Sequence, residues 1–363
     1  MKKRLLSLLL VLLVSQSLLL VPPALADEKT QMLKYSYMFF GTFDTAISII
    51  GYAPSREAFD KAATLAEAEF NRLHKLYNQY YPYEGINNIY ALNYGAAKEP
   101  MHVPEDLFKL LAWCKEQQRQ TRGRVNIALG AVLSLWHDER DNAELNPDKA
   151  RLPDRAALEK ANAHTDINDL ILDEARQTVF YADPLLKLDV GAVAKGYATE
   201  LVARQLLNSD MSSFIINAGG NVRTGHPPLD GRSSWGIGIQ DPDADLVLPA
   251  GNDVMDVLYL SDLSLVTSGD YQRYYVVGDK RYHHLISPDT LMPADFMRSV
   301  TIITQDSGLA DLLSTAVFLM PFEEGYEFVT SLEGVEAFWI LSDRSIRMTP
   351  GAQAVSYNQG YRP

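Results

Sequence analysis

Two charged residues flank a pair of small residues near the middle of the chain, with Asp189 before Gly191-Ala192 and Lys195 after it. The segment from Leu185 to Val190 is short and mostly apolar, which predicts a buried strand. From Val193 to about Asn208, apolar residues recur at helical spacing. We therefore predict a tight strand-to-helix turn with a carboxylate and an ammonium group at its mouth.

Such a turn presents backbone N–H groups at a helix N-terminus, where the partial positive charge favours an anion. Lys195 adds a full charge, and Asp189 adds a hydrogen-bond acceptor. This chemistry suits a ligand with phosphate groups and a sugar or base. An ordinary packing turn with a solvated Lys195 fits the same residues equally well. The spacing is not that of a P-loop, because Gly196 follows the lysine, and it is not G-x-G-x-x-G.

A second candidate site is a helix predicted from Leu309 to Met320. Asp311 and Thr315 are four residues apart and share one face, with Ser314 beside them. Such oxygen atoms, together with backbone carbonyls and ligand phosphates, can hold a hard cation such as Mg²⁺. The alternative is that Asp311 is an ordinary helix-start residue.

Two adjacent histidines follow a predicted hairpin over Tyr274 to Tyr282, which turns at Gly278-Asp279. Because neighbouring strand residues face opposite sides, we expect only one of His283 and His284 to face a site. A structural role is the alternative for either histidine. An imidazole with a pKa near 7 would suit acid-base chemistry.

Aromatic residues in two segments could contact a flat ring. Phe39-Phe40 lie in a strand-forming stretch from Tyr35 to Gly51, in which Gly41 indicates a bulge or a close backbone approach. Tyr77 to Tyr83 is a tyrosine-rich loop. For the two phenylalanines, core packing is the alternative.

The remaining elements must bring these distant groups together. Helices are predicted over residues 58–76 and 104–120, and strands over 213–218, 235–239 and 299–304. A polar, proline-bearing stretch near 138–165 predicts an excursion or an internal seam. Hairpin signals are common and β-α-β alternation is rare, which favours α+β architecture with antiparallel sheets.

Composition limits the classes of function. The chain has 363 residues, 47% of them hydrophobic, which is ample for a core. Without residues 1–26 the formal net charge falls from −13 to −16, because this segment holds three basic and no acidic residues. A chain this acidic has no basic field for nucleic acid. Cys114 is the single cysteine and is expected to be a small buried hydrophobe.

Residues 1–26 have the pattern of a secretory signal peptide. Lys2, Lys3 and Arg4 precede an apolar run, and Ala24-Leu25-Ala26 supplies small residues for cleavage. We expect export to the extracytoplasmic side and a mature domain over 27–363. The alternative is an uncleaved membrane anchor. No cysteine stands at the junction, so lipid attachment there is excluded.

A series of segments between about residues 36 and 348 resembles the FAD:protein FMN transferase family, also known as ApbE. The longest, Leu188-Asp-Val-Gly-Ala-Val-Ala-Lys-Gly-Tyr-Ala198, matches the family signature almost throughout. The others follow in the family's order: Phe40-Gly-Thr42, Asn217-Ala-Gly-Gly-Asn221, Trp235-Gly-Ile-Gly-Ile239, Ser268-Gly-Asp-Tyr271, His284-Leu-Ile-Ser-Pro288 and Ala310-Asp-Leu-Leu-Ser-Thr-Ala316.

The resemblance implies an α+β fold of layered, largely antiparallel sheets with flanking helices, and an FAD and Mg²⁺ site between two lobes. It implies transfer of FMN from FAD to a Thr or Ser hydroxyl of a target protein, with release of AMP. His284 is the candidate base. The residues implied at FAD are Phe40, Tyr81, Asn126, Asp189, Lys195, Gly219, Gly220 and Ile286. Those implied at Mg²⁺ are Asp311, Ser314, Thr315 and the carbonyl of Ala192.

Four positions depart from the family pattern. Asn126 and Ser287 replace aspartates, Leu291 replaces a turn glycine, and Phe40 replaces methionine. Two other functions therefore remain open: an FAD pyrophosphatase, in which water replaces the target hydroxyl, and a flavin-binding protein without catalysis. The chain has no Ser/Thr-Gly-Ala-Thr acceptor sequence, so self-modification is not expected.

Overall fold

Eight strands form the largest sheet of the computed structural model, which describes residues 31–244 and 253–363. Their order is β1-β2-β6-β7-β10-β13-β14-β15, and every neighbouring pair is antiparallel. The strands span Leu33–Thr42 (β1), Thr45–Ala53 (β2), Phe214–Ala218 (β6), Asn221–Thr224 (β7), Ser264–Gly269 (β10), Met297–Thr304 (β13), Glu336–Leu341 (β14) and Ile346–Met348 (β15). The predicted α+β class with antiparallel sheets is confirmed.

The β1–β2 hairpin contains the bulge that its glycine indicated. The register shifts between Phe39 and Thr42, and Gly41 has φ 83°. Phe43 and Asp44 form the two-residue turn, and both have φ 53°. Positive φ at both turn positions matches the twist of the flanking strands, although Asn-Gly is the usual sequence there.

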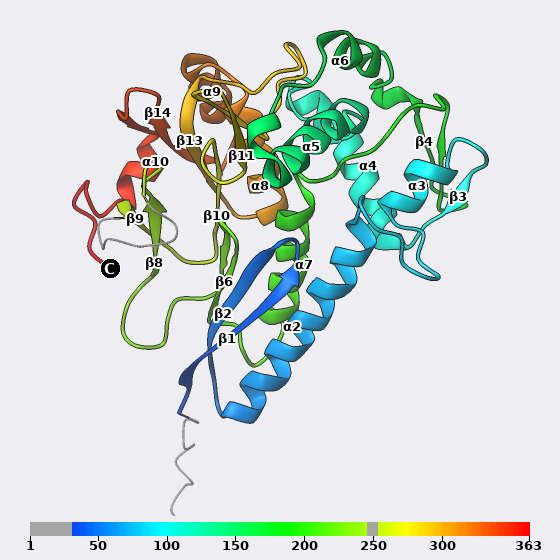
Figure 1. Cartoon of the computed structure of the whole chain (residues 1–363). Helices are drawn as coiled ribbons and strands as arrows, with labels where there is room; N and C mark the ends of the chain where they lie inside the picture. The colour runs from blue at the N-terminus through cyan, green and yellow to red at the C-terminus, as the bar shows by residue number, and fades with distance from the viewer. Residues whose placement is uncertain (1–30, 245–252) are drawn as a thin grey trace, which may run out of the picture. The chain divides into compact units, whose positions relative to one another are not determined.

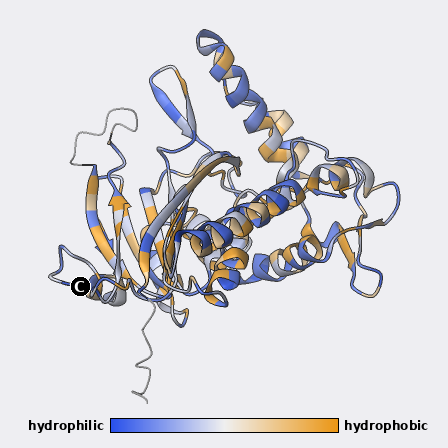
Figure 2. Cartoon of the chain, turned by 90° about the horizontal axis from the view of Figure 1, so that it is seen from below, coloured by the Kyte–Doolittle hydropathy of each residue, from blue (hydrophilic) through white to orange (hydrophobic). Residues whose placement is uncertain are grey.

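Three helices cover one face of this sheet (Figure 1). Helix α2 (Arg56–Tyr77) starts where the Ser55 side chain accepts a hydrogen bond from the Ala58 N–H at 3.1 Å. It packs against α7 (Ala194–Leu207), which packs against α8 (Ser307–Phe318), and α8 lies on β10 and β13. On α2 itself, Phe59, Phe70 and Leu73 are fully buried. These helices agree with the predicted periodicities, and Figure 2 shows helices with hydrophobic residues along only part of their surface.

Two smaller cores surround the main one. The pair β8 (Trp235–Gln240) and β9 (Val254–Leu260) packs with α10 (Pro350–Ala354). The hairpin β11 (Tyr274–Val277) and β12 (Lys280–His283) packs on α5 (Gly130–Leu145) through Trp136 and Tyr275. Figure 1 shows β8 and β9 on the opposite side of the view from α5.

The other elements complete a single compact unit, Leu33–Pro363. They are α3 (Ile89–Gly95), β3 (Met101–His102), α4 (Glu105–Gln120), η1 (Pro147–Lys149), α6 (Arg155–Asn162), η2 (Ile167–Asp169), β4 (Leu170–Asp173), β5 (Thr178–Tyr181) and α9 (Phe322–Thr330). The segment near 138–165 holds the end of α5, η1 and α6. The predicted signal peptide lies outside the described residues. Within residues 31–244 and 253–363, no helix has the length and apolarity that a membrane span requires.

One predicted element is wrong. Residues 185–190 do not form a strand of any sheet, and only Lys187 makes an isolated bridge, to Leu129. The apolar residues Leu186, Leu188 and Val190 are nevertheless buried. The segment makes two backbone hydrogen bonds to residues 127–130, from the Gly130 N–H to the Lys187 carbonyl at 3.1 Å and from the Asp189 N–H to the Ile127 carbonyl at 2.8 Å, which is too little pairing for a strand.

Candidate functional site

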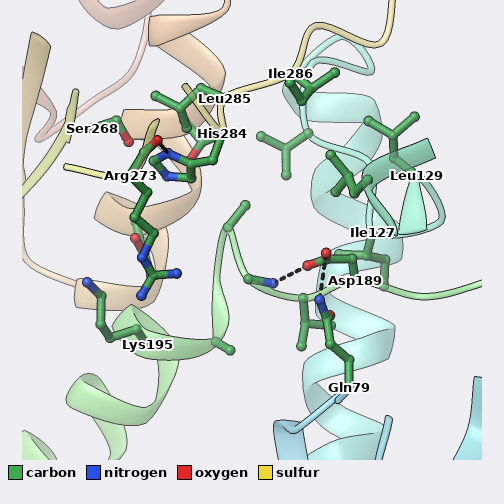
Figure 3. Close-up of a pocket in the computed structure, with 18 of the residues that line it drawn as sticks. Gln79, Ile127, Leu129, Asp189, Lys195, Ser268, Arg273, His284, Leu285 and Ile286 are labelled. Carbon is green, nitrogen blue, oxygen red and sulfur yellow. Dashed lines mark hydrogen bonds between the residues drawn. The ribbon is translucent and has the colours of Figure 1, made fainter. Parts of the chain in front are cut away.

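A cavity of about 220 Å³ opens where the segments around the central turn meet α8 and the β11–β12 hairpin. Eight of the residues expected at a site line it: Asn126, Asp189, Ala192, Lys195, His284, Ile286, Asp311 and Thr315. They come from segments that are far apart in the sequence. Figure 3 shows Lys195 and Asp189 on opposite sides of the central segment, with His284 above them.

Asp189 is held firmly at the cavity wall. Its Oδ2 accepts a hydrogen bond from Gln79 Nε2 at 2.7 Å, and its Oδ1 accepts one from the Gly191 N–H at 2.8 Å. Both bonds appear as dashed lines in Figure 3. The expectation that turn N–H groups are free for a ligand is wrong at Gly191, because the adjacent carboxylate already uses that group.

Lys195 projects from the first turn of α7. Its Nζ donates a hydrogen bond to the Gly219 carbonyl at 2.8 Å. Burial lowers the pKa of Lys195 to about 8, against the opposing attraction of the Asp311 carboxylate. The solvated lysine of the packing alternative is therefore not what the structure contains.

Asp311 brings α8 against α7. Its Oδ2 accepts a hydrogen bond from the Gly196 N–H at 2.7 Å, across 115 residues of sequence. Burial raises the pKa of Asp311, and nearby Lys195 opposes the rise. The approach needs glycine, because a Cβ at Gly196 would overlap the Ser307 carbonyl and the Asp311 side chain. The ordinary helix-start role belongs instead to Asp306, which caps α8.

The oxygen atoms near Asp311 fit a hard cation. Thr315 and Ala192 line the same cavity and supply a hydroxyl and a carbonyl. Ser314 does not line it, because its hydroxyl contacts Ser268 Oγ at 2.8 Å and donates to the Asp311 carbonyl at 2.9 Å. Among the described residues, no cluster of three or more His, Cys, Asp or Glu is suited to a metal. Ligand phosphates and water would have to complete the coordination.

His284 faces the cavity, whereas His283 is buried and contacts the Ala294 carbonyl through Nε2 at 2.6 Å. The prediction that only one histidine faces the site is confirmed. His284 Nδ1 lies 3.1 Å from the Arg273 carbonyl, so Nδ1 is the donor and Nε2 keeps its lone pair. Burial, aided by the Arg273 cation, lowers the pKa of His284 to about 3. This environment therefore does not give His284 the pKa near 7 that would suit a general base.

The side chain of Asn126 stabilises the loop in which it lies through two hydrogen bonds. Its Nδ2 donates to the Thr165 carbonyl at 2.8 Å, and its Oδ1 accepts from the Ala128 N–H at 2.9 Å. An ionised aspartate has no donor for Thr165, so the amide is the side chain that suits this loop. Leu291 has φ 59°, which explains why a glycine suits that position in the family pattern.

Several expected residues lie elsewhere. Phe40 and Tyr81 are 71% and 66% exposed and line neither this cavity nor a neighbouring one of about 690 Å³. Gly219 and Gly220 line the neighbouring cavity only. Besides His284, the aromatic residues that do line the first cavity are Phe43, His74, Tyr77, Tyr80 and His137.

Arg273 is a site residue that the sequence reasoning missed. It lines both cavities, and its guanidinium makes no ion pair with any described residue. In the sequence, Arg273 is marked as a candidate only because it lies two residues after the Ser268-Gly-Asp-Tyr271 segment. A cation without a carboxylate partner at a cavity wall suits an anionic ligand.

Two cations, hard oxygen donors and several aromatic rings in one cavity define a site for a ligand with phosphate groups and a flat ring system.

Comparison with known proteins agrees with this class of binding site. The sequence matches the ApbE family over residues 43–339. It is 30% identical over 285 residues to the FAD:protein FMN transferase of Klebsiella pneumoniae (strain 342), which covers 77% of this chain and 84% of that protein.

A second relative, the FAD:protein FMN transferase of Treponema pallidum (strain Nichols), is 32% identical over 274 residues and 72% of each chain. The crystal structure of the ApbE protein from Thermotoga maritima has a TM-score of 0.76 at 28% identity, covering 89% of this chain and 99% of that one. The chain therefore belongs to the ApbE family.

Proposed function

We propose that this protein is an exported, Mg²⁺-dependent transferase that moves FMN from FAD to a Thr or Ser hydroxyl of a target protein and releases AMP. The observation that carries the proposal is the meeting of Lys195, Asp311, Thr315 and His284 in one cavity of an ApbE family member. Relatives named FAD:protein FMN transferase support the same activity.

The chemistry of a phosphoanhydride suits these residues. Its clustered negative charge must be neutralised and held in line with the attacking oxygen. Lys195 and Arg273 would bind phosphate oxygens, and Asp311, Thr315 and the Ala192 carbonyl would hold Mg²⁺. When bound, the ion would neutralise charge on the phosphates as the bond to AMP breaks.

His284 is the proposed base for the target hydroxyl. Its Nε2 lone pair is available because Nδ1 donates to the Arg273 carbonyl. Bound phosphates would offset the Arg273 charge, which is the second cause, after burial, that lowers the pKa of His284. Proton transfer to a positioned imidazole is the usual form of general-base catalysis.

Residues 27–363, FAD, Mg²⁺ and an acceptor domain carrying a Ser-Gly-Ala-Thr sequence provide the test. In-gel flavin fluorescence reports the covalent product, and chromatography reports AMP and FMN. A fluorescent acceptor together with AMP, both lost with EDTA, is the expected result. AMP and free FMN with a dark acceptor would instead make the protein an FAD pyrophosphatase. Retained FAD without AMP would leave a binding protein.

Export is tested separately. The N-terminal residue of the secreted protein, determined by sequencing in a host with a general secretion pathway, should be Asp27. Retention of residues 1–26 in a membrane fraction would indicate the anchor alternative.

A further inference from the structure

The second cavity, of about 690 Å³, lies against the main sheet beside the first one. Its lining includes residues of β1, β2, β6, β7, β8 and β10. Five residues line both cavities: Asp44, Lys195, Thr267, Gln272 and Arg273. The two cavities therefore meet at the cations that would hold phosphate.

Four glycines contribute to the wall of the second cavity. Gly219, Gly220, Gly236 and Gly238 all line it. Gly219 and Gly220 have φ 58° and 91°, a region in which side chains are strained. A Cβ at Gly219 would also overlap the Thr45 hydroxyl. The backbone geometry at Gly219 and Gly220 therefore keeps side chains out of this part of the wall.

Strand β8 contributes an open edge. It pairs only with β9 among the described strands. Four residues of β8 line the cavity and none of β9 do, so the edge turned away from β9 faces the cavity. An unpaired strand edge beside glycines accepts an extended peptide through main-chain hydrogen bonds.

The distribution of aromatic residues separates the two cavities. Six ring-bearing residues line the first, whereas Tyr271 is the only aromatic residue lining the second, and it is 6% exposed. The first cavity therefore offers more aromatic partners for the flat rings of FAD than the second.

We propose that the second cavity binds an extended segment of the acceptor protein and presents its Thr or Ser hydroxyl to the phosphate at the junction. This inference rests on the proposed transferase function. The hydroxyl oxygen bonds to the phosphorus of the FMN phosphate, and the bond from that phosphorus to the AMP oxygen breaks. AMP leaves with the electron pair, and the hydroxyl proton passes to Nε2 of His284.

Replacement of Ser48 tests the site. Ser48 on β2 is half-buried and lines the second cavity only, so Ser48→Trp fills this cavity. We expect the KM for the Ser-Gly-Ala-Thr acceptor domain to rise about tenfold or more, equivalent to about 1.4 kcal/mol. The Kd for FAD, measured by quenching of flavin fluorescence, should change less than about twofold.

Ser36→Trp is the matched control, because Ser36 is an exposed residue of β1 that lines neither cavity. It should leave both constants unchanged. Unchanged FAD binding shows that each variant is folded. As an independent measurement, a benzophenone placed beside the acceptor threonine should cross-link to peptides containing β8.

The possible results distinguish the acceptor-binding inference from the proposed transferase function. A Ser48→Trp enzyme with weakened FAD binding and an unchanged acceptor KM would assign the cavity to FAD and overturn the inference. An unchanged acceptor KM with cross-links away from β8 would also overturn it, while the transferase function stands. A wild-type enzyme that transfers no FMN would overturn both.

Discussion

Asp311 and Lys195 are oppositely charged groups that share a buried site. Burial opposes both charges, raising one pKa and lowering the other. Buried charges are costly to fold, so their presence at a cavity marks a functional role rather than a contribution to stability. At this site the buried carboxylate of Asp311 is suited to bind a cation, and the buried ammonium group of Lys195 is suited to bind an anion.

The first prediction concerns Asp311→Asn. The amide oxygen still accepts from the Gly196 N–H, so the unfolding free energy should be unchanged or about 1 kcal/mol higher. Transfer should fall about a hundredfold or more, because the charged cation ligand is gone. Added Mg²⁺ should raise the Tm of the wild type and not of the variant. An equal Mg²⁺ effect on both proteins would place the ion elsewhere.

The second prediction uses Cys114 in α4. The side chain is 2% exposed, and burial raises the pKa of its thiol. A raised pKa leaves almost no thiolate at pH 8, and the thiolate is the reactive form. Folded protein should therefore not react with a disulfide reagent at pH 8, whereas denatured protein should release one equivalent. Rapid labelling of the folded protein would contradict this burial.

Among the elements, α7, β7 and α8 are joined by one buried carboxylate. Glu200 on α7 accepts hydrogen bonds from Arg223 of β7 at 3.1 Å and from the Ser307 N–H at the start of α8 at 3.1 Å. Arg204 contacts the other carboxylate oxygen at 2.9 Å. Since α7 carries Lys195 and α8 carries Asp311, this network sets the spacing of the candidate site.

The third prediction is a double-mutant cycle. Glu200→Met should cost about 3 kcal/mol of unfolding free energy, because it leaves the buried Arg223 guanidinium without its ion pair. Arg223→Met should cost less, because Arg204 still pairs with the Glu200 carboxylate. The double variant should cost less than the sum of the two by about 1 kcal/mol or more. Urea denaturation measures each value. Additive losses would show that the two side chains do not interact.

At the scale of the whole molecule, residues 33–363 form one compact unit although they contain three separate hydrophobic clusters. The cluster around α5 is tied to the site, because Leu129 and Ile286 belong to it and also line the first cavity. Trp136 fixes this cluster by donating a hydrogen bond to the Leu291 carbonyl at 3.1 Å.

The fourth prediction follows from this arrangement. Calorimetry of residues 27–363 should give one unfolding transition with equal calorimetric and van't Hoff enthalpies. Trp136→Ala should lower the whole transition, at a cost of about 3 kcal/mol. Leu145→Ala, at an exposed position of the same helix, is the control and should change little. A separate early transition in Trp136→Ala would mean that the 138–165 region unfolds independently.

The sequence by itself determined the elements and the family. The helix over residues 58–76, the hairpin turn at Gly278-Asp279 and the single site-facing histidine all follow from local signals. Apolar periodicity decides which face of an element is buried, and caps and turn residues decide where it ends. The segments that resemble the family also predicted candidate site residues. Their order and spacing along the chain can be recognised without knowledge of the packing.

Tertiary structure alone decided how those residues meet. Asp311 reaches Gly196 only because α8 packs against α7, and no local pattern encodes a contact across 115 residues. The pKa of His284 depends on burial and on Arg273, which the hairpin fold brings beside it. The segment 185–190 shows the same limit, since an apolar run becomes a strand only when a partner pairs with it. Local chemistry thus specified the groups, while their distances, charges and exposure came from long-range packing.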